Sequence, residues 1–249
     1  ARDGPRDGLV SLEDYVGRMK ESQDAIYYIS GEDVDSMLVS PHLEGFKAKG
    51  VEVLMMTDSV DDFWISSVGV YKEKTFKSAT RAGADLDKIK VGKKDGKDKA
   101  PGKDKGKDKK KDADKDKAAE AIAPLLAQFK VVLGEAVKDV CASERLTESP
   151  VCLVTGEGDM DARLEKMLKQ NRQAGMPDLT PRVLEVNPGH ALIKRLAKRA
   201  KASDGKDSLI ADAAHLLLDQ ARIIEGETVV DPKAFSRRLS AVMESGLKV

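Results

Sequence analysis

The sequence contains few cysteines and histidines, and these shortages exclude whole classes of protein. Its 249 residues include two Cys and three His, too few for a disulfide framework or a metal-ligand cluster. We interpret Cys141 and Cys152 as reduced core residues. No stretch reaches the roughly 18 apolar residues of a membrane-spanning helix, and no signal-peptide pattern opens the chain. A soluble, cytoplasmic protein is therefore expected.

Familiar catalytic and nucleotide-binding motifs are missing as well. The chain has no GxxxxGK[ST] loop, HExxH pair, GxSxG elbow or zinc-type Cys pair. The turn at Gly156 and Gly158 superficially resembles a dinucleotide fingerprint. However, the third glycine position holds Asp161, whose carboxylate would face a pyrophosphate. The residues alone therefore identify no catalytic site.

Positive and negative charges balance over the whole chain, but they are unevenly distributed along it. Lys plus Arg number 43, as do Asp plus Glu. Residues 92–117 contain 12 Lys and 7 Asp, so this segment carries a charge of +5 and the remaining chain −5. Low hydrophobicity and dense charge predict a disordered linker over residues 91–117. Interspersed Asp and the lack of aromatic residues argue against nucleic-acid binding there.

Before the linker, short β-rich runs alternate with helix-compatible sequence. Three strands are predicted, over residues 26–29, 51–56 and 76–80. The roughly twenty residues between the first two are typical of a βαβ unit. A leading helix is predicted over residues 12–19, with Ser11 as its N-cap. These features predict a small α/β body over residues 1–90.

After the linker, residues 118–249 predict an α+β body that ends in a helix bundle. A helix over 118–134, interrupted at Pro124, precedes an antiparallel hairpin of strands 137–142 and 151–155. A further strand is expected over 182–186. The last third is helical and apolar on more than one face, which predicts a homodimer. The predicted interface residues are Leu216, Leu217, Leu218, Ala221, Ile224, Phe235, Leu239, Val242 and Met243.

Two groups of apolar side chains are candidates for a contact surface. Phe63 and Trp64 follow the acidic pair Asp61 and Asp62, and they either fill the small core or expose one ring. A second group recurs at helical spacing and is either core or an adaptable, Met-rich contact surface. This group consists of Met160, Leu164, Met167 and Leu168.

Several strings of residues along the chain carry a family resemblance. They include LEDYVGRMK at 12–20, IYYISGE at 26–32, SPHLE at 40–44, KTFKS at 74–78, RLTESP at 145–150, LEVNPGH at 184–190 and LLLDQA at 216–221. In this order they resemble the heat shock protein 90 chaperone family, in its bacterial HtpG branch. The resemblance covers nearly the whole chain apart from the first ten residues and the linker.

The resemblance is to the carboxy-terminal half of the family's polypeptide. It implies that residues 1–90 are the carboxy-terminal α/β part of the middle domain and that residues 118–249 are the dimerisation domain. The parent protein would then be an ATP-driven chaperone. This chain would be no enzyme, because the ATPase domain and the catalytic arginine of the middle domain would be absent. ATP and Mg would bind in the parent's missing amino-terminal domain.

The resemblance also implies roles for the apolar groups. In bacterial family members, a Trp after an acidic pair and a Met-rich helix contact non-native clients. Phe63, Trp64 and Asp62 match the first feature, and which aromatic ring faces the client is left open. The second feature matches Met160, Leu164, Met167 and Leu168.

Partners follow from the same resemblance. We expect a homodimer through the terminal helices, non-native client proteins and the bacterial heat shock protein 70 system, and neither nucleic acid nor membrane. The alternative is a purely structural dimerisation module, in which all apolar stripes lie in the core or the dimer interface.

Overall fold

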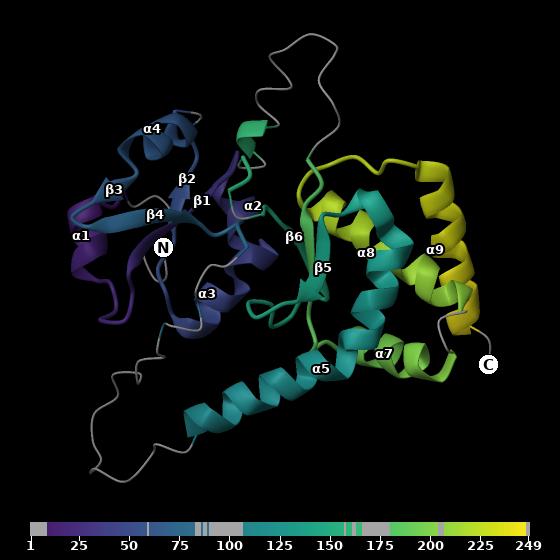
Figure 1. The fold of residues 1–249 in the computed structure, drawn as a ribbon. Helices are drawn as coiled ribbons and strands as arrows, with labels where there is room; N and C mark the ends of the chain where they lie inside the picture. Colours follow the sequence, from purple (N-terminus) through teal and green to yellow (C-terminus); the bar gives the residue numbers. More distant parts are fainter. Residues whose placement is uncertain are drawn as a thin grey trace. The chain divides into compact units, whose positions relative to one another are not determined.

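Two units make up the fold of the computed structural model (Figure 1). The structure describes residues 9–58, 60–82, 86, 89, 107–156, 158–160, 163–165, 180–203 and 207–247. Unit 1 comprises residues 1–92 and 154–182, and unit 2 comprises residues 93–153 and 183–249. Residues 154–182, expected with the second body, therefore group with the first.

Backbone pairing explains why this later segment belongs to unit 1. Thr155 forms a parallel bridge with Arg81. Its N–H donates to the carbonyl oxygen of Thr80 at 3.0 Å, and its carbonyl accepts from the N–H of Ala82 at 2.9 Å. Such a pairing between distant residues leaves no periodic signal in the sequence.

Unit 1 is built on a four-stranded sheet with the order β2-β1-β4-β3. The central strand β1 (Ala25–Ser30) pairs in parallel with β2 (Leu54–Met56) and with β4 (Lys74–Ser78). The short strand β3 (Val70–Tyr71) pairs antiparallel with β4. Because β1 and β2 are parallel and joined through helices, the predicted βαβ unit is confirmed.

Two helices of unit 1 start at residues whose side chains cap them. Ser11 caps the first helix, and its hydroxyl accepts from the N–H of Asp14 at 3.1 Å, as predicted. Asp33 caps the second helix in the same way, accepting from the N–H of Ser36 at 2.8 Å. The helices are α1 (Leu12–Gly17), α2 (Val34–Leu38), η1 (Pro41–Leu43), α3 (Glu44–Lys49) and α4 (Asp61–Val68).

The strand β1 is buried on both of its faces. Tyr27 packs edge-on against Phe46 of α3, with ring centroids 4.9 Å apart. On the other face, Ile26 lies in a cluster with Tyr15 of α1 and Leu54 of β2. Helices therefore cover both sides of the sheet, as an α/β body requires.

The hydroxyl group of Tyr15 connects α1 to the sheet. It donates to the carbonyl oxygen of Glu52 at 2.8 Å and accepts from the N–H of Tyr27 at 3.0 Å and the amide of Gln23 at 2.9 Å. Burial raises the pKa of Tyr15 to about 12, so the hydroxyl keeps its proton and can donate.

Unit 2 is built on a three-stranded sheet with the order β5-β7-β6. The strands are β5 (Asp139–Ala142), β6 (Val151–Val154) and β7 (Val183–Val186), and β5 pairs in parallel with β7. The predicted hairpin of the first two strands is wrong, because β7 lies between them. Nearness in sequence favoured the hairpin, whereas β7, which comes from further along the chain, takes the central position.

Four helices and a short 3-10 turn complete the described part of unit 2. Three of these helices share one core with the sheet, which includes Phe129, Leu184, Ile193 and Leu218. The elements are α5 (Lys107–Leu133), η3 (Gly134–Ala136), α7 (Ala191–Ser203), α8 (Ser208–Ile224) and α9 (Pro232–Leu247). Both units thus mix helices and strands, in agreement with the expected α/β class.

The helix α5 begins earlier than expected. Residues 107–117, assigned to the disordered linker from their composition, are helical, whereas residues 91–106 lie outside the described residues. Residues 107–117 contain neither Gly nor Pro, the two residues that disfavour a helix most. Pro124 does not end the helix, because the turns around it bury apolar residues such as Leu125 in the core.

A buried ion pair lies in the sheet of unit 2. The Nε of Arg145 is 3.1 Å from Oε2 of Glu185, and both side chains are almost inaccessible to solvent. The hydroxyl of Ser143 donates to the same oxygen at 2.7 Å.

Both cysteines are free thiols. Burial, followed by the charge of Glu185, raises the pKa of Cys141 to about 11. This supports the interpretation of Cys141 as an unreactive core residue.

Among the described helices, none is both long and apolar enough to cross a membrane.

The two-residue turn between β3 and β4 yields a prediction about stability. Lys72 and Glu73 adopt φ values of +47° and +61°, a left-handed conformation that costs a non-glycine residue about 1 kcal/mol. We expect Glu73→Gly to raise the free energy of unfolding by about 0.5 kcal/mol, measured by urea denaturation. Glu73→Ala is the control, because it removes the same carboxylate but keeps the strain. An equal gain in both variants would contradict the explanation.

Candidate functional site

The helix α4 follows directly on the parallel edge strand β2, and short polar contacts set its start. The Asp58 carboxylate accepts from the N–H of Val60 at 3.0 Å. The Asp61 carboxylate accepts from the N–H of Asp58 at 3.2 Å. These two carboxylates therefore hold the turn that leads into α4, whose N-cap residue, Val60, makes no side-chain capping bond.

The two aromatic residues of α4 have different environments. The indole Nε1 of Trp64 donates to Oδ1 of Asp61 at 2.8 Å. The same ring packs edge-on against Phe76 of β4, with centroids 5.6 Å apart and an interplanar angle of 86°. Trp64 is thus half-buried and held on the sheet, whereas 51% of Phe63 is exposed. Phe63 is therefore the ring that faces solvent.

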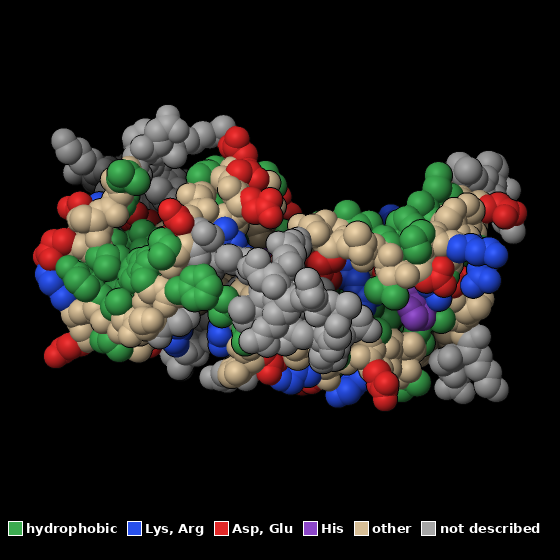
Figure 2. All heavy atoms as spheres, turned by 90° about the horizontal axis from the view of Figure 1, so that it is seen from above, with side chains coloured by type: hydrophobic (Ala, Val, Ile, Leu, Met, Phe, Trp, Pro, Cys, Tyr) green, Lys and Arg blue, Asp and Glu red, His purple; other side chains and the backbone are tan. Residues whose placement is uncertain are grey.

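Further exposed apolar side chains lie beside Phe63 in sequence, at both ends of α4 and at the start of β3. Figure 2 shows apolar side chains gathered over this part of unit 1, at the left of the view. We call this group the α4 surface. It consists of Val60, Phe63, Val68 and Val70, each about half exposed (56%, 51%, 49% and 52%). Exposed apolar side chains that gather on one part of a surface mark contact sites more often than isolated ones do.

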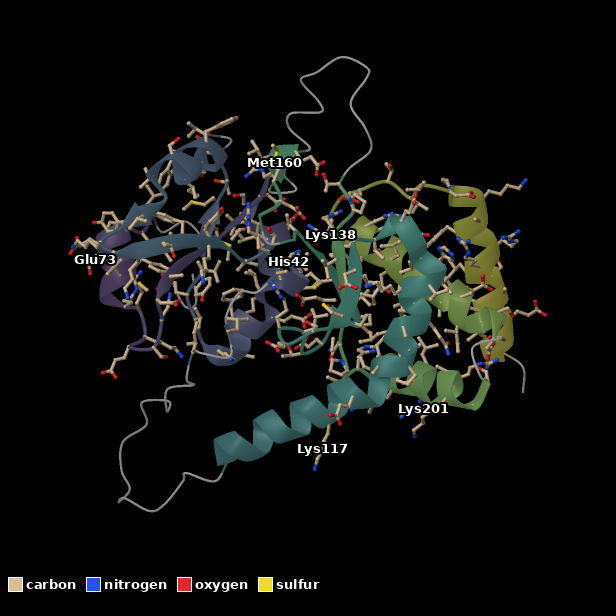
Figure 3. All side chains as sticks on the ribbon, viewed as in Figure 1. His42, Glu73, Lys117, Lys138, Met160 and Lys201 are labelled. Atoms are coloured by element: carbon tan, nitrogen blue, oxygen red, sulfur yellow. The ribbon has the colours of Figure 1, made fainter. Side chains whose placement is uncertain are left out.

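The second candidate group belongs to the same unit as the first. Met160, labelled in Figure 3, is 50% exposed, and Leu164 is half-buried. The guanidinium of Arg163 donates to the carbonyl oxygen of Met56 at the end of β2, at 3.2 Å. This contact ties the segment to the strand that precedes α4.

Other members of the predicted client site cannot be compared with the structure. Met167 and Leu168 lie outside the described residues. Asp62 is part of α4, but its side chain is not described.

The predicted dimer residues fall into three groups by exposure. Leu217, Leu218 and Ala221 are buried in the core of the single chain. Leu216, Phe235 and Val242 are half-buried. The exposed members are Ile224, Leu239 and Met243, with exposed fractions of 45%, 40% and 59%.

The sequence-based prediction missed exposed residues at the end of α8. Ile223 is 50% exposed and Val230, between α8 and α9, is 77% exposed. The only sequence signal was the pair of isoleucines at 223 and 224, which continues the apolar run beyond one face.

The comparisons with known proteins identify the family. A family model described as Hsp90 protein matches residues 4–249. The chain belongs to the Hsp90 family. The chaperone protein HtpG of Paramagnetospirillum magneticum is 55% identical over 244 residues, and that of Roseobacter denitrificans is 51% identical over 242 residues. These alignments cover 97% and 96% of this chain, but 36% of each relative's length.

Expectations about missing parts of this Hsp90 chain need correction. The resemblance predicts a carboxy-terminal half without the ATPase domain, without enzymatic activity and without ATP or Mg. The comparisons instead assign the matched 36% of the HtpG relatives to their amino-terminal, ATPase-bearing region. The exclusion of ATPase activity, ATP and Mg from this chain therefore does not stand.

The described residues alone do not place a site for ATP or Mg. Among them, no group of three or more His, Cys, Asp or Glu could hold a metal ion. Gly158, with φ of +84°, forms part of the GxG turn, and Asp161, at the third glycine position of the fingerprint, lies outside the described residues. We therefore assign no described residue of this Hsp90 chain to the nucleotide.

The single tryptophan of the chain can report on the geometry of α4. We expect Asp61→Ala to release the indole, because the acceptor of its N–H is lost, and so to lower the fluorescence anisotropy of Trp64 and shift its emission to longer wavelength. Asp58→Ala is the matched control, since it removes a neighbouring carboxylate without touching the indole. Unchanged fluorescence in Asp61→Ala would contradict the anchoring role.

Proposed function

We propose that this chain is a chaperone segment that holds non-native protein on the α4 surface and forms homodimers through α8 and α9. The observation that carries the proposal is the exposure of Phe63 beside Val60, Val68 and Val70. The names of the relatives, chaperone protein HtpG, support the same function.

The mechanism of holding is reversible burial of apolar surface, without covalent chemistry. Unfolded chains expose apolar side chains, and covering them is worth about 25 cal/mol for each Å² removed from water. A fixed ring binds at a lower entropic cost than a mobile one. The anchored Trp64 gives α4 this rigidity, while Met160 adds a flexible thioether that adapts to different clients.

The alternative function is a purely structural dimerisation module. It requires the apolar groups to lie in the core or in an interface. Phe63 and Met160 are half exposed in the single chain, and neither belongs to a core cluster. Their exposure excludes a place in the core of the single chain, so the structural module would require a partner subunit to cover both side chains.

Dimerisation is proposed through an apolar strip on the two terminal helices. The strip consists of Ile223, Ile224, Leu239 and Met243. The helices α8 and α9 pack against each other, and the guanidinium of Arg238 lies 3.5 Å from the Asp212 carboxylate between them. Two such helix pairs would form a four-helix bundle that covers both strips.

The wider setting is part of the same proposal. The resemblance supports a bacterial chaperone that acts in the cytoplasm and cooperates with the heat shock protein 70 system.

Client binding is tested at Phe63. We expect Phe63→Ser to weaken binding of reduced, carboxymethylated lactalbumin, a permanently unfolded protein, by about tenfold, because a half-exposed ring contributes on the order of 1–2 kcal/mol when a client covers it. Binding is measured by fluorescence anisotropy of the labelled client.

The matched control is Val39→Ser, which alters a more accessible apolar residue of unit 1 outside the α4 surface. Val39 is 81% exposed, so both variants should fold. Equal loss in both variants, or no loss in Phe63→Ser, would reject the α4 surface as the client site.

Dimerisation is tested on α9. Leu239→Glu combined with Met243→Glu should produce a monomer in sedimentation velocity, because the interface would bury unpaired carboxylates. Ala241→Glu is the control, since Ala241 is exposed on the opposite side of α9 and should leave the dimer intact. A double variant that sediments like the unaltered protein would refute the proposed strip.

A further inference from the structure

The helix α7 separates apolar and basic residues onto opposite sides. Ile193, Leu196, Ala197 and Ala200 are buried in the core of unit 2. At 100° per residue these four centre on one side of the helix. The opposite, exposed side carries Lys194, Arg195, Lys198, Arg199 and Lys201, and α7 contains no acidic residue.

Most of these cations have no partner among the described residues. Arg199 pairs with the carboxylate of Asp207, which caps α8. In the part of the chain that the structure describes, Lys194, Arg195, Lys198 and Lys201 form no ion pair. We call these four residues the α7 basic face.

The α7 basic face lies on a helix that is held in place by packing against its neighbours. The helix packs on α5 and α8, and its core side is almost completely inaccessible to solvent. Figure 3 shows Lys201 of α7 and Lys117 of α5 pointing to the same side of unit 2. Fixed, unpaired cations of one sign raise the local electrostatic potential and attract anions.

We propose that the α7 basic face is a docking site for an acidic polypeptide segment, separate from the α4 surface and independent of the client-binding proposal. Lys194, Lys198 and Lys201 lie at i, i+4 and i+7 and so form a row of about 10 Å along the helix. A partner helix with Glu or Asp at the same spacing places one carboxylate opposite each ammonium group.

Other anionic partners fit this face less well. Single-stranded nucleic acid needs aromatic rings for base stacking, and α7 has none. Duplex nucleic acid depends on many phosphate contacts, whereas the face supplies four free cations. A membrane surface requires apolar residues that insert beside the charges, but the apolar side of α7 is occupied by the core.

The proposal is tested by charge reversal in the full chain. The probe is a short, fluorescein-labelled helical peptide with Glu at i, i+4 and i+7 positions, and binding is followed by anisotropy. We expect Lys194→Glu combined with Lys198→Glu to weaken binding by at least about tenfold. Binding to the unaltered chain should also weaken as salt rises from about 50 to 200 mM.

The matched control is Lys233→Glu combined with Arg237→Glu, an equally exposed pair four residues apart on α9 of the same unit. It changes the net charge identically and should leave peptide binding within about twofold. Circular dichroism and sedimentation establish that both variants fold and assemble alike. If both pairs weaken binding equally, only net charge matters and the proposal fails.

Competing probes distinguish the partner classes. A duplex DNA of matched charge and phosphatidylserine vesicles are titrated in the same way. Tighter binding of either probe, lost in the α7 variant, would overturn the assignment to an acidic polypeptide, as would no binding of the Glu peptide. A peptide with Gln in place of Glu should not bind; if it does, charge is not the recognised feature.

Discussion

The hydrogen bond between the Trp64 indole and Asp61 is the constraint on which the candidate client surface depends. It orients one aromatic ring of α4 onto Phe76 of the sheet and leaves the adjacent ring of Phe63 exposed. Neighbouring positions on a helix differ by about 100°, so anchoring one side chain determines where the next one points. A single polar contact thereby converts an apolar pair, which could have filled the core, into a rigid exposed site.

Features that depend on local interactions could be predicted from the sequence. The N-cap at Ser11 and the βαβ connection between β1 and β2 follow from short-range capping and periodicity. The order of the second sheet could not be predicted, because β7 enters between β5 and β6 from about 30 residues further along the chain. The grouping of Thr155 with Arg81 is of the same long-range kind.

The burial of single side chains in the candidate sites could not be predicted from the sequence either. Leu217 and Leu239 look alike in a helical apolar pattern, yet one fills the core and the other is 40% exposed. The pattern counts apolar positions, whereas burial depends on which neighbouring helix covers them. Likewise, the sequence left Phe63 and Trp64 undistinguished, because the distinction requires the position of Phe76, which comes from another strand.

The net charge of the chain gave no indication of the α7 basic face. Outside the linker the chain carries −5, an average that suggested a mildly acidic body. The cations of α7 are hidden in that average because acidic residues elsewhere outnumber them, but electrostatic attraction depends on charges within about 10 Å. On α7 itself, Lys194 and Lys198 lie among other cations such as Arg195, and the helix contains no acidic residue. Folding therefore turns a neutral composition into a locally basic face, and an acidic partner would respond to the face.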